Sequence, residues 1–79
     1  MDFLIGTILL FPYSFTPENW LPCDGRTIPV NQYQTLFALI GNTYGGDSQN
    51  FKLPDLGGAK PHDKIQYFIA VIGVFPTRN

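Results

Sequence analysis

Few side chains of this 79-residue sequence could do chemistry. A nucleophile and its base would have to come from the single cysteine, Cys23, the single histidine, His62, and an aspartate. Cys23 lies directly before the turn signal Asp24-Gly25 and has no activating neighbour in the sequence, and a chain of this length leaves little room for a cleft. We therefore predict that the protein is not an enzyme. Cys23 is expected to be a buried, inert thiol, with a disulfide between two chains as the alternative.

Sites for metals, nucleic acids and sugars have no better support. A metal site needs several ligands, and His62 stands alone between Pro61 and Asp63, so we expect a solvated loop residue unless symmetry brings ligands from other chains. The five basic residues are scattered along a chain of net charge -1, which argues against a phosphate-binding surface. Trp20, the single tryptophan, is expected to anchor a loop, and stacking on a sugar is its alternative role. No cofactor is predicted.

One domain over residues 1–79 is expected, because neither an internal repeat nor a low-complexity linker interrupts the sequence. With 44% hydrophobic residues the chain is too apolar to be a disordered segment. A folded domain of this size buries only about 60 to 65% of the surface that its unfolded chain exposes. Its own core is therefore expected to be marginal.

A helix is predicted in the middle of the chain. The side-chain oxygen of Asn31 can cap a helix, Gln34 completes a capping-box-like pair, and Gly41 can close the helix in the left-handed conformation. The apolar residues between them repeat with the one-sided spacing of a helix that lies on a core: Tyr33, Leu36, Phe37 and Ile40. This pattern predicts a helix over residues 32–40.

Turns are predicted on both sides of this helix. Gly45-Gly46-Asp47 predicts a corner in which one of the two glycines takes a positive φ. Asp24-Gly25 predicts a tight turn in which the Asp24 side chain bonds the backbone two residues on. Phe51 and Leu53 alternate with polar neighbours, which predicts a short strand that Pro54 ends. The residues expected to shape these turns are Asp24, Gly25, Gly45, Gly46, Asp47, Pro54 and Asp55.

Two apolar segments, residues 3–11 and 65–75, predict strands near the two ends of the chain. Residues 3–11 are too few to span a membrane, so membrane insertion is not predicted. They follow Asp2 with no basic region and precede no small-residue cleavage site, so a secretory signal peptide is not predicted either. Both strands are apolar on both faces, so we expect them to be neighbours in the sheet and not exposed edges. The predicted fold is α+β: a small, loop-rich sheet with both terminal strands and one amphipathic helix packed on it.

A sheet with two apolar faces needs two covers, and the sequence supplies one helix. Loops bearing Phe15 and Trp20 can shield only part of the second face, so another subunit is expected to cover the rest. We therefore predict a homo-oligomer, either a closed ring or trimer or an open filament, with strand addition between chains as a further possibility. The candidate interface residues are Phe3, Ile5, Leu9, Phe11, Tyr67, Ile69, Val71 and Phe75.

Short motifs, read in order, resemble one family. Cys23-Asp24-Gly25-Arg26, Tyr44-Gly45-Gly46-Asp47 and Leu53-Pro54-Asp55-Leu56 look like the phage tail collar domain and the related bacterial microcystin-dependent proteins. The ending, residues 69–78, is similar to the terminal strand of the latter group. Two departures stand out: Gly57-Gly58-Ala59 follows where the family typically has Arg-Gly-Arg, and only an ordinary loop replaces the family's long glycine-rich segment.

The resemblance implies a minimal collar that lacks the variable head, the part associated in short tail fibres with receptor contact and a histidine-bound metal. It implies an extracellular structural protein that assembles with itself, and with related tail or fibre proteins, into a fibre, collar or filament of a virion or a cell surface. The alternative that it leaves open is a tail-fibre tip module that binds a receptor or cell-surface glycans.

Overall fold

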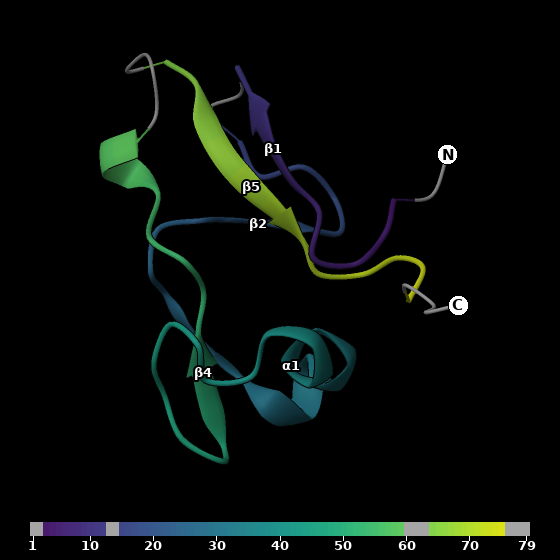
Figure 1. The fold of residues 1–79 in the computed structure, drawn as a ribbon. Helices are drawn as coiled ribbons and strands as arrows, with labels where there is room; N and C mark the ends of the chain where they lie inside the picture. Colours follow the sequence, from purple (N-terminus) through teal and green to yellow (C-terminus); the bar gives the residue numbers. More distant parts are fainter. Residues whose placement is uncertain (1–2, 13–14, 60–63, 76–79) are drawn as a thin grey trace.

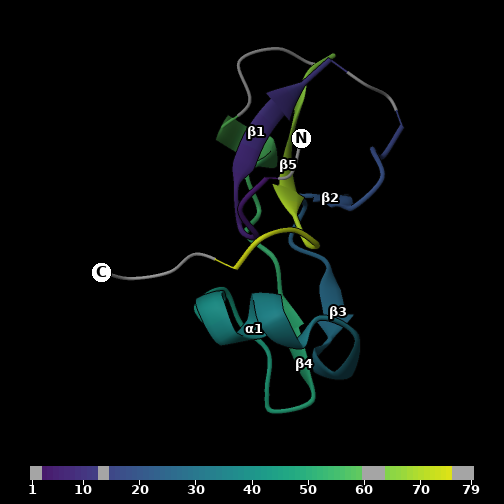
Figure 2. The same cartoon turned by 90° about the vertical axis from the view of Figure 1, so that its right-hand side faces the viewer.

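The structure, a computed structural model, describes residues 3–12, 15–59 and 64–75. The described residues form two antiparallel sheets and one α-helix, so the α+β prediction is confirmed. The first sheet has the order β1-β5-β2 (Figure 1), and the second pairs β3 with β4 (Figure 2). The elements are β1 (Ile8–Phe11), β2 (Trp20–Pro22), β3 (Thr27–Pro29), the 3-10 turn η1 (Val30–Gln32), α1 (Gln34–Ile40), β4 (Asn50–Lys52), the 3-10 turn η2 (Gly57–Ala59) and β5 (Gln66–Ala70).

The first and last strands are neighbours, as predicted. β1 pairs antiparallel with β5, and Leu9 lies opposite Phe68. β2 pairs with the other side of β5, where Leu21 lies opposite Ile69. β5 is therefore the central strand and β1 is an edge strand, so the expectation that neither terminal strand would be an edge is wrong for β1.

Both terminal strands are shorter than predicted. Gly6 has φ +87°, which breaks the segment 3–11 before β1 begins at Ile8. β5 ends at Ala70, and beyond it Val74 makes only an isolated parallel bridge with Leu4. Because the alternation of side chains is interrupted at these points, the two-face assignment made over the full segments does not hold.

The helix begins at Gln34, two residues later than predicted, and the prediction that Asn31 caps it is wrong. Residues 30–32 form the turn η1 instead, and no side chain caps the start of α1. The N–H of Val30 donates to the Gln49 carbonyl oxygen at 2.9 Å, which holds this turn against the corner before β4. The predicted end of the helix at Gly41 is confirmed, and the Gly41 N–H donates to the Phe37 carbonyl oxygen at 2.8 Å. Gly41 has a positive φ of +55°, but its ψ of -143° lies outside the left-handed helical region that was predicted.

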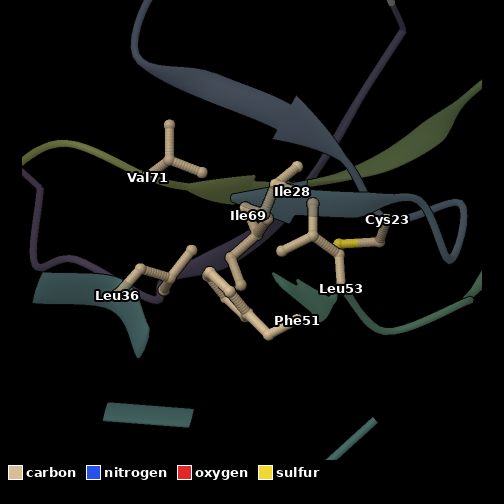
Figure 3. Close-up of a cluster of buried hydrophobic side chains, with 7 residues drawn as sticks. All are labelled: Cys23, Ile28, Leu36, Phe51, Leu53, Ile69 and Val71. Atoms are coloured by element: carbon tan, nitrogen blue, oxygen red, sulfur yellow. The ribbon is translucent and has the colours of Figure 1, made fainter. Parts of the chain in front are cut away.

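The main core lies between the two sheets and the helix. α1 lies beside β4 (Figure 2), where the rings of Phe37 and Phe51 meet edge to face with centroids 5.1 Å apart. Leu36 is fully buried, and it joins the helix to Ile69 of the central strand. The cluster drawn in Figure 3 consists of Cys23, Ile28, Leu36, Phe51, Leu53, Ile69 and Val71. The helix thus packs on a sheet as predicted, but the second, smaller sheet next to it was not anticipated.

A second cluster covers the opposite face of β5, because Phe68 and Ala70 alternate with Ile69 along the strand. Trp20 lies on them at 8% exposure, and its ring meets that of Phe11 edge to face with centroids 5.1 Å apart. The anchoring role predicted for Trp20 is confirmed. Both faces of the central strand are therefore covered by the chain itself, so the expectation that a sheet face stays open is wrong for β5.

Candidate functional site

The most unusual surface of the protein is an apolar edge, which we define by its exposed hydrophobic residues: Phe3, Leu4, Ile8, Leu9, Leu10, Ile72, Val74 and Phe75. These residues come from β1 and from the two terminal segments that meet at the Leu4–Val74 bridge. Neither residues 3–12 nor residues 65–75 contain a charged side chain. Exposed apolar side chains concentrated on neighbouring segments in this way are typical of a protein interface.

A β-bulge sets the orientation of the edge strand. The N–H of Gly6 donates to the Ala70 carbonyl oxygen at 2.9 Å, and the N–H of Ala70 donates to the Thr7 carbonyl oxygen at 2.8 Å. Two residues of one strand thus oppose one residue of the other, with a positive-φ glycine at the first position, which is the G1 type of bulge. Only glycine adopts this conformation readily. Gly6 therefore fixes which β1 residues turn their backbone N–H and C=O groups toward β5 and which turn them to the open edge.

The structure divides the predicted interface residues into three groups. Ile5, Ile69 and Val71 are buried, at 7%, 1% and 6% exposure, and belong to the protomer's own interior. Phe11 and Tyr67 are half-buried against the two clusters. The exposed ones, which lie on the apolar edge, are Phe3, Leu9 and Phe75.

Sequence reasoning missed the rest of the apolar edge, which had been assigned to the opposite strand faces. Leu4, Ile8 and Leu10 alternate with the predicted set along the first segment, and Ile72 and Val74 do so along the last. The signal that could have found them is a glycine inside each apolar run, Gly6 and Gly73, because such a glycine often marks a bulge or a close backbone approach.

Two of the motifs lie against each other and join the two sheets. The N–H of Leu53 donates to the Arg26 carbonyl oxygen at 3.0 Å, and the N–H of Leu56 donates to the Cys23 carbonyl oxygen at 2.9 Å. A Cβ added to Gly25, which has φ +80°, would lie 3.2 Å from the Asp55 Cβ. The residues 23–26 and 53–56 therefore form one closely fitted seam beyond the β3–β4 ladder.

The side-chain bond predicted for Asp24 is confirmed, but the tight turn is wrong, because Asp24 forms an isolated antiparallel bridge with Asp55 and residues 23–26 make no turn. Asp24 Oδ1 accepts the Arg26 N–H at 3.1 Å, two residues on. The Arg26 guanidinium also donates to both carboxylate oxygens, from Nε at 3.1 Å and from Nη2 at 3.0 Å. This forked pair lowers the pKa of the Asp24 carboxyl and raises that of Arg26. β2 and β3, which flank this segment, belong to different sheets, so the segment connects the sheets and does not close a hairpin.

The corner at residues 45–47 forms as predicted. Gly45 and Gly46 have φ +123° and +109°. Asp47 Oδ1 accepts the N–H groups of Gln49 and Asn50, both at 2.9 Å, and these bonds lower the pKa of its carboxyl. The predicted positive φ is confirmed at both glycines, and the corner delivers the chain into β4.

A comparison of the sequence with protein families matches a region that includes both the seam and the corner. The family described as Phage Tail Collar Domain matches residues 6–61 of the chain. The chain belongs to the phage tail collar domain family. A phage-tail structural role and a virion-associated location follow from that membership, and the family is not one of enzymes. No individual curated protein matches the chain.

The one thiol of this collar domain is poorly suited to chemistry. Cys23 is 2% exposed and packs in the main core, so the predicted burial is confirmed. Burial, with a smaller contribution from the Asp24 carboxylate, raises the pKa of the Cys23 thiol from its ordinary 9.0 to about 11. A thiol of this pKa is almost wholly protonated near neutral pH, and the thiolate is the nucleophile.

Metal and membrane sites have no counterpart in the part of the chain that the structure describes. Its residues hold no group of three or more His, Cys, Asp or Glu placed to bind a metal ion. His62, predicted to be a solvated loop residue, lies outside the described residues. None of the described helices is long and apolar enough to cross a bilayer.

A polar hollow of about 470 Å³ lies between η1, the start of α1 and the corner before β4. Pro29 and Val30 supply its apolar lining. The remaining lining residues are neutral and polar: Asn31, Gln34, Ser48, Gln49 and Asn50. Amide and hydroxyl groups of this kind can both donate and accept hydrogen bonds without a charge.

Proposed function

We propose that this collar domain is a non-enzymatic structural subunit that assembles with copies of itself into a fibre, collar or filament of a phage tail or a tail-derived device. The observation that carries the proposal is the apolar edge. Ile72, Leu4 and Phe75 are 59%, 51% and 48% exposed, in a protein that otherwise buries a core on both faces of its central strand. A protein that is soluble as a single chain usually buries such apolar side chains in its interior.

The test is the assembly state of charge-bearing variants. Ile72→Lys and Val74→Lys place a cation in the middle of the apolar edge without touching the core, so we expect each to dissociate the assembly. Tyr44→Lys is the matched control, because Tyr44 is similarly exposed, at 49%, but belongs to the turn that follows α1 and not to the segments that form the edge. Sedimentation velocity at equal protein concentration gives the masses. Dissociation by Tyr44→Lys to the same extent, or unchanged assembly in both edge variants, would contradict the proposal.

A second candidate function, binding of cell-surface glycans, is favoured by the polar hollow. The neutral amides and the hydroxyl of its lining match the donors and acceptors of a neutral sugar, and its apolar lining residues match the C–H faces of the sugar ring. The volume of about 470 Å³ is in the range of ligand sites. A glycan array tests it. Selective binding that is lost in Asn31→Ala and Gln34→Ala but kept in Ile72→Lys would support a receptor-binding tip, and no selective signal would leave assembly alone.

A further inference from the structure

We infer that β1 adds to β1 of a second copy, antiparallel and across a two-fold axis at Leu9, so that two three-stranded sheets become one continuous sheet. This inference rests on the proposed self-assembly and specifies its geometry. Figure 2 shows β1 at the outer side of β5, with β2 on the other side. No strand among the described residues pairs with the outer edge of β1.

The backbone of β1 offers two residues for such pairing. The bulge makes Thr7 bond Ala70, so the antiparallel alternation turns the polar groups of Leu9 toward β5 and those of Ile8 and Leu10 away from it. The pairs Ile8↔Ile69 and Leu10↔Tyr67 are thus the non-hydrogen-bonded pairs of the ladder. The outer edge of β1 therefore presents the N–H and C=O groups of Ile8 and Leu10 as donors and acceptors.

Only one two-fold register uses all of these groups. With Leu9 on the axis, Ile8 of each copy faces Leu10 of the other, and each such pair exchanges two hydrogen bonds. With Leu10 on the axis, Ile8 would face Pro12, which has no N–H. With Ile8 on the axis, Leu10 would face Gly6, whose N–H is already bonded to Ala70. The two flanking residues therefore select the register centred on Leu9.

The charge pattern of the edge identifies a second copy as the partner. A two-fold axis places each side chain near its own equivalents, so any charge on the strand would meet a like charge. Residues 3–12 carry none, and the lysines that commonly protect an edge strand from self-pairing are absent from this segment. Leu9 and Leu10, at 37% and 40% exposure, would instead meet apolar side chains of the partner. A charged or strongly polar partner strand would form the backbone hydrogen bonds but would find no complementary side chains on this edge.

Disulfide trapping tests the register. The two Leu9 residues would form a non-hydrogen-bonded pair, whose Cα atoms lie about 4.5 Å apart, within the range that a disulfide bridges. Leu9→Cys, in a Cys23→Ala background, should therefore give a covalent dimer on mild oxidation, seen by non-reducing electrophoresis. Ile72→Cys in the same background is the matched control. It is more exposed, on the apolar edge but off the axis, and should cross-link at least several-fold more slowly.

A proline variant tests the hydrogen bonds. Leu10→Pro removes an N–H that faces outward and leaves the β1–β5 ladder intact, so the fold should persist, by near-ultraviolet circular dichroism, while the two-fold contact is lost. The possible outcomes separate this inference from the proposed function. A wild-type protein that assembles, with no Leu9→Cys dimer and with unchanged assembly of Leu10→Pro, would overturn the strand pairing and leave assembly through another surface. A wild-type protein of single-chain mass would overturn both.

Discussion

Replacement of Gly46 by alanine should destabilise the fold far more than replacement of its neighbour. Gly46 has φ +109°, a conformation that L side chains rarely adopt, and this strain costs on the order of 1 kcal/mol. An added Cβ would also collide with the Asn50 carbonyl oxygen and lie 2.6 Å from the Phe51 Cα. These are backbone atoms beside a fully buried ring, so a rotamer change cannot relieve the contact, and overpacking of this kind costs about 1–3 kcal/mol more.

The expected sum, about 2–4 kcal/mol, is a large fraction of the 4–12 kcal/mol that a domain of this length typically has. Each kcal/mol lowers the Tm of such a domain by about 4–8 °C, so Gly46→Ala should melt at least about 8 °C below wild type. Gly45→Ala shares the positive φ, but its Cβ would meet only the flexible Lys52 side chain, at 3.0 Å, and about 1 kcal/mol is expected.

Gly58→Ala is the control for this series, because an added Cβ there meets nothing within 4 Å and the residue has no positive φ. Thermal unfolding followed by circular dichroism at one fixed protein concentration gives the order, since assembly also shifts Tm. We expect the loss to rank Gly46 above Gly45 and Gly45 above Gly58. Equal melting of the Gly46 and Gly58 variants would refute the assignment of the corner.

Three further predictions concern the core, the thiol and the ion pair. Leu36→Ala should lower the free energy of unfolding by about 2–5 kcal/mol in denaturant titrations, because Leu36 is fully buried. Leu39→Ala is the control and should cost clearly less, because Leu39 is 36% exposed. Similar losses in the two variants would contradict the packing of α1. Since the pKa of Cys23 is raised on folding, the unfolded chain loses this proton first, and wild type should lose stability relative to Cys23→Ala as pH rises from 9 to about 11; parallel pH profiles would argue against a buried thiol. Asp24→Asn removes the forked ion pair with Arg26 but keeps a side-chain oxygen that can accept the Arg26 N–H. It should therefore lower the free energy of unfolding by less than about 1 kcal/mol at pH 7. Because folding lowers the pKa of Asp24, this difference should vanish as pH falls through that lowered value, and a difference that persists in acid would point to another cause.

The sequence was most informative where side-chain pattern and backbone chemistry act over a few residues. The stripe with Leu36 and Phe37, the stop at Gly41 and the corner at Gly45 and Gly46 were all predicted and are confirmed. Each depends on local rules, the helical period and the freedom of glycine, that tertiary contacts did not override. The pairing of the terminal strands was predicted for a different reason, because both segments are too apolar for exposed edges and a small sheet has few interior positions. The pairing is confirmed, but that reason does not hold for β1, which is an edge strand.

What the sequence did not predict depends on contacts between distant segments. The start of α1 was misplaced because the bond from Val30 to Gln49 holds residues 30–32 in a separate turn, and the Asn31 side chain caps nothing. The second sheet was missed because β3 and β4 have three residues each, too few for a reliable period. The exposure of β1 was predicted for Leu9 but missed for Ile8 and Leu10 on its other face, because the sequence did not show that β1 would be an edge strand with both faces exposed.

The central claim is that the apolar edge makes this collar domain a self-assembling subunit. The most direct measurement is the mass of the wild-type protein by multi-angle light scattering at micromolar concentration and after serial dilution. The account predicts a well-folded species of at least twice the 8.9 kDa chain mass, with dissociation on dilution shifted to higher concentration by Ile72→Lys. A well-folded species with the mass of one chain at every concentration would contradict it.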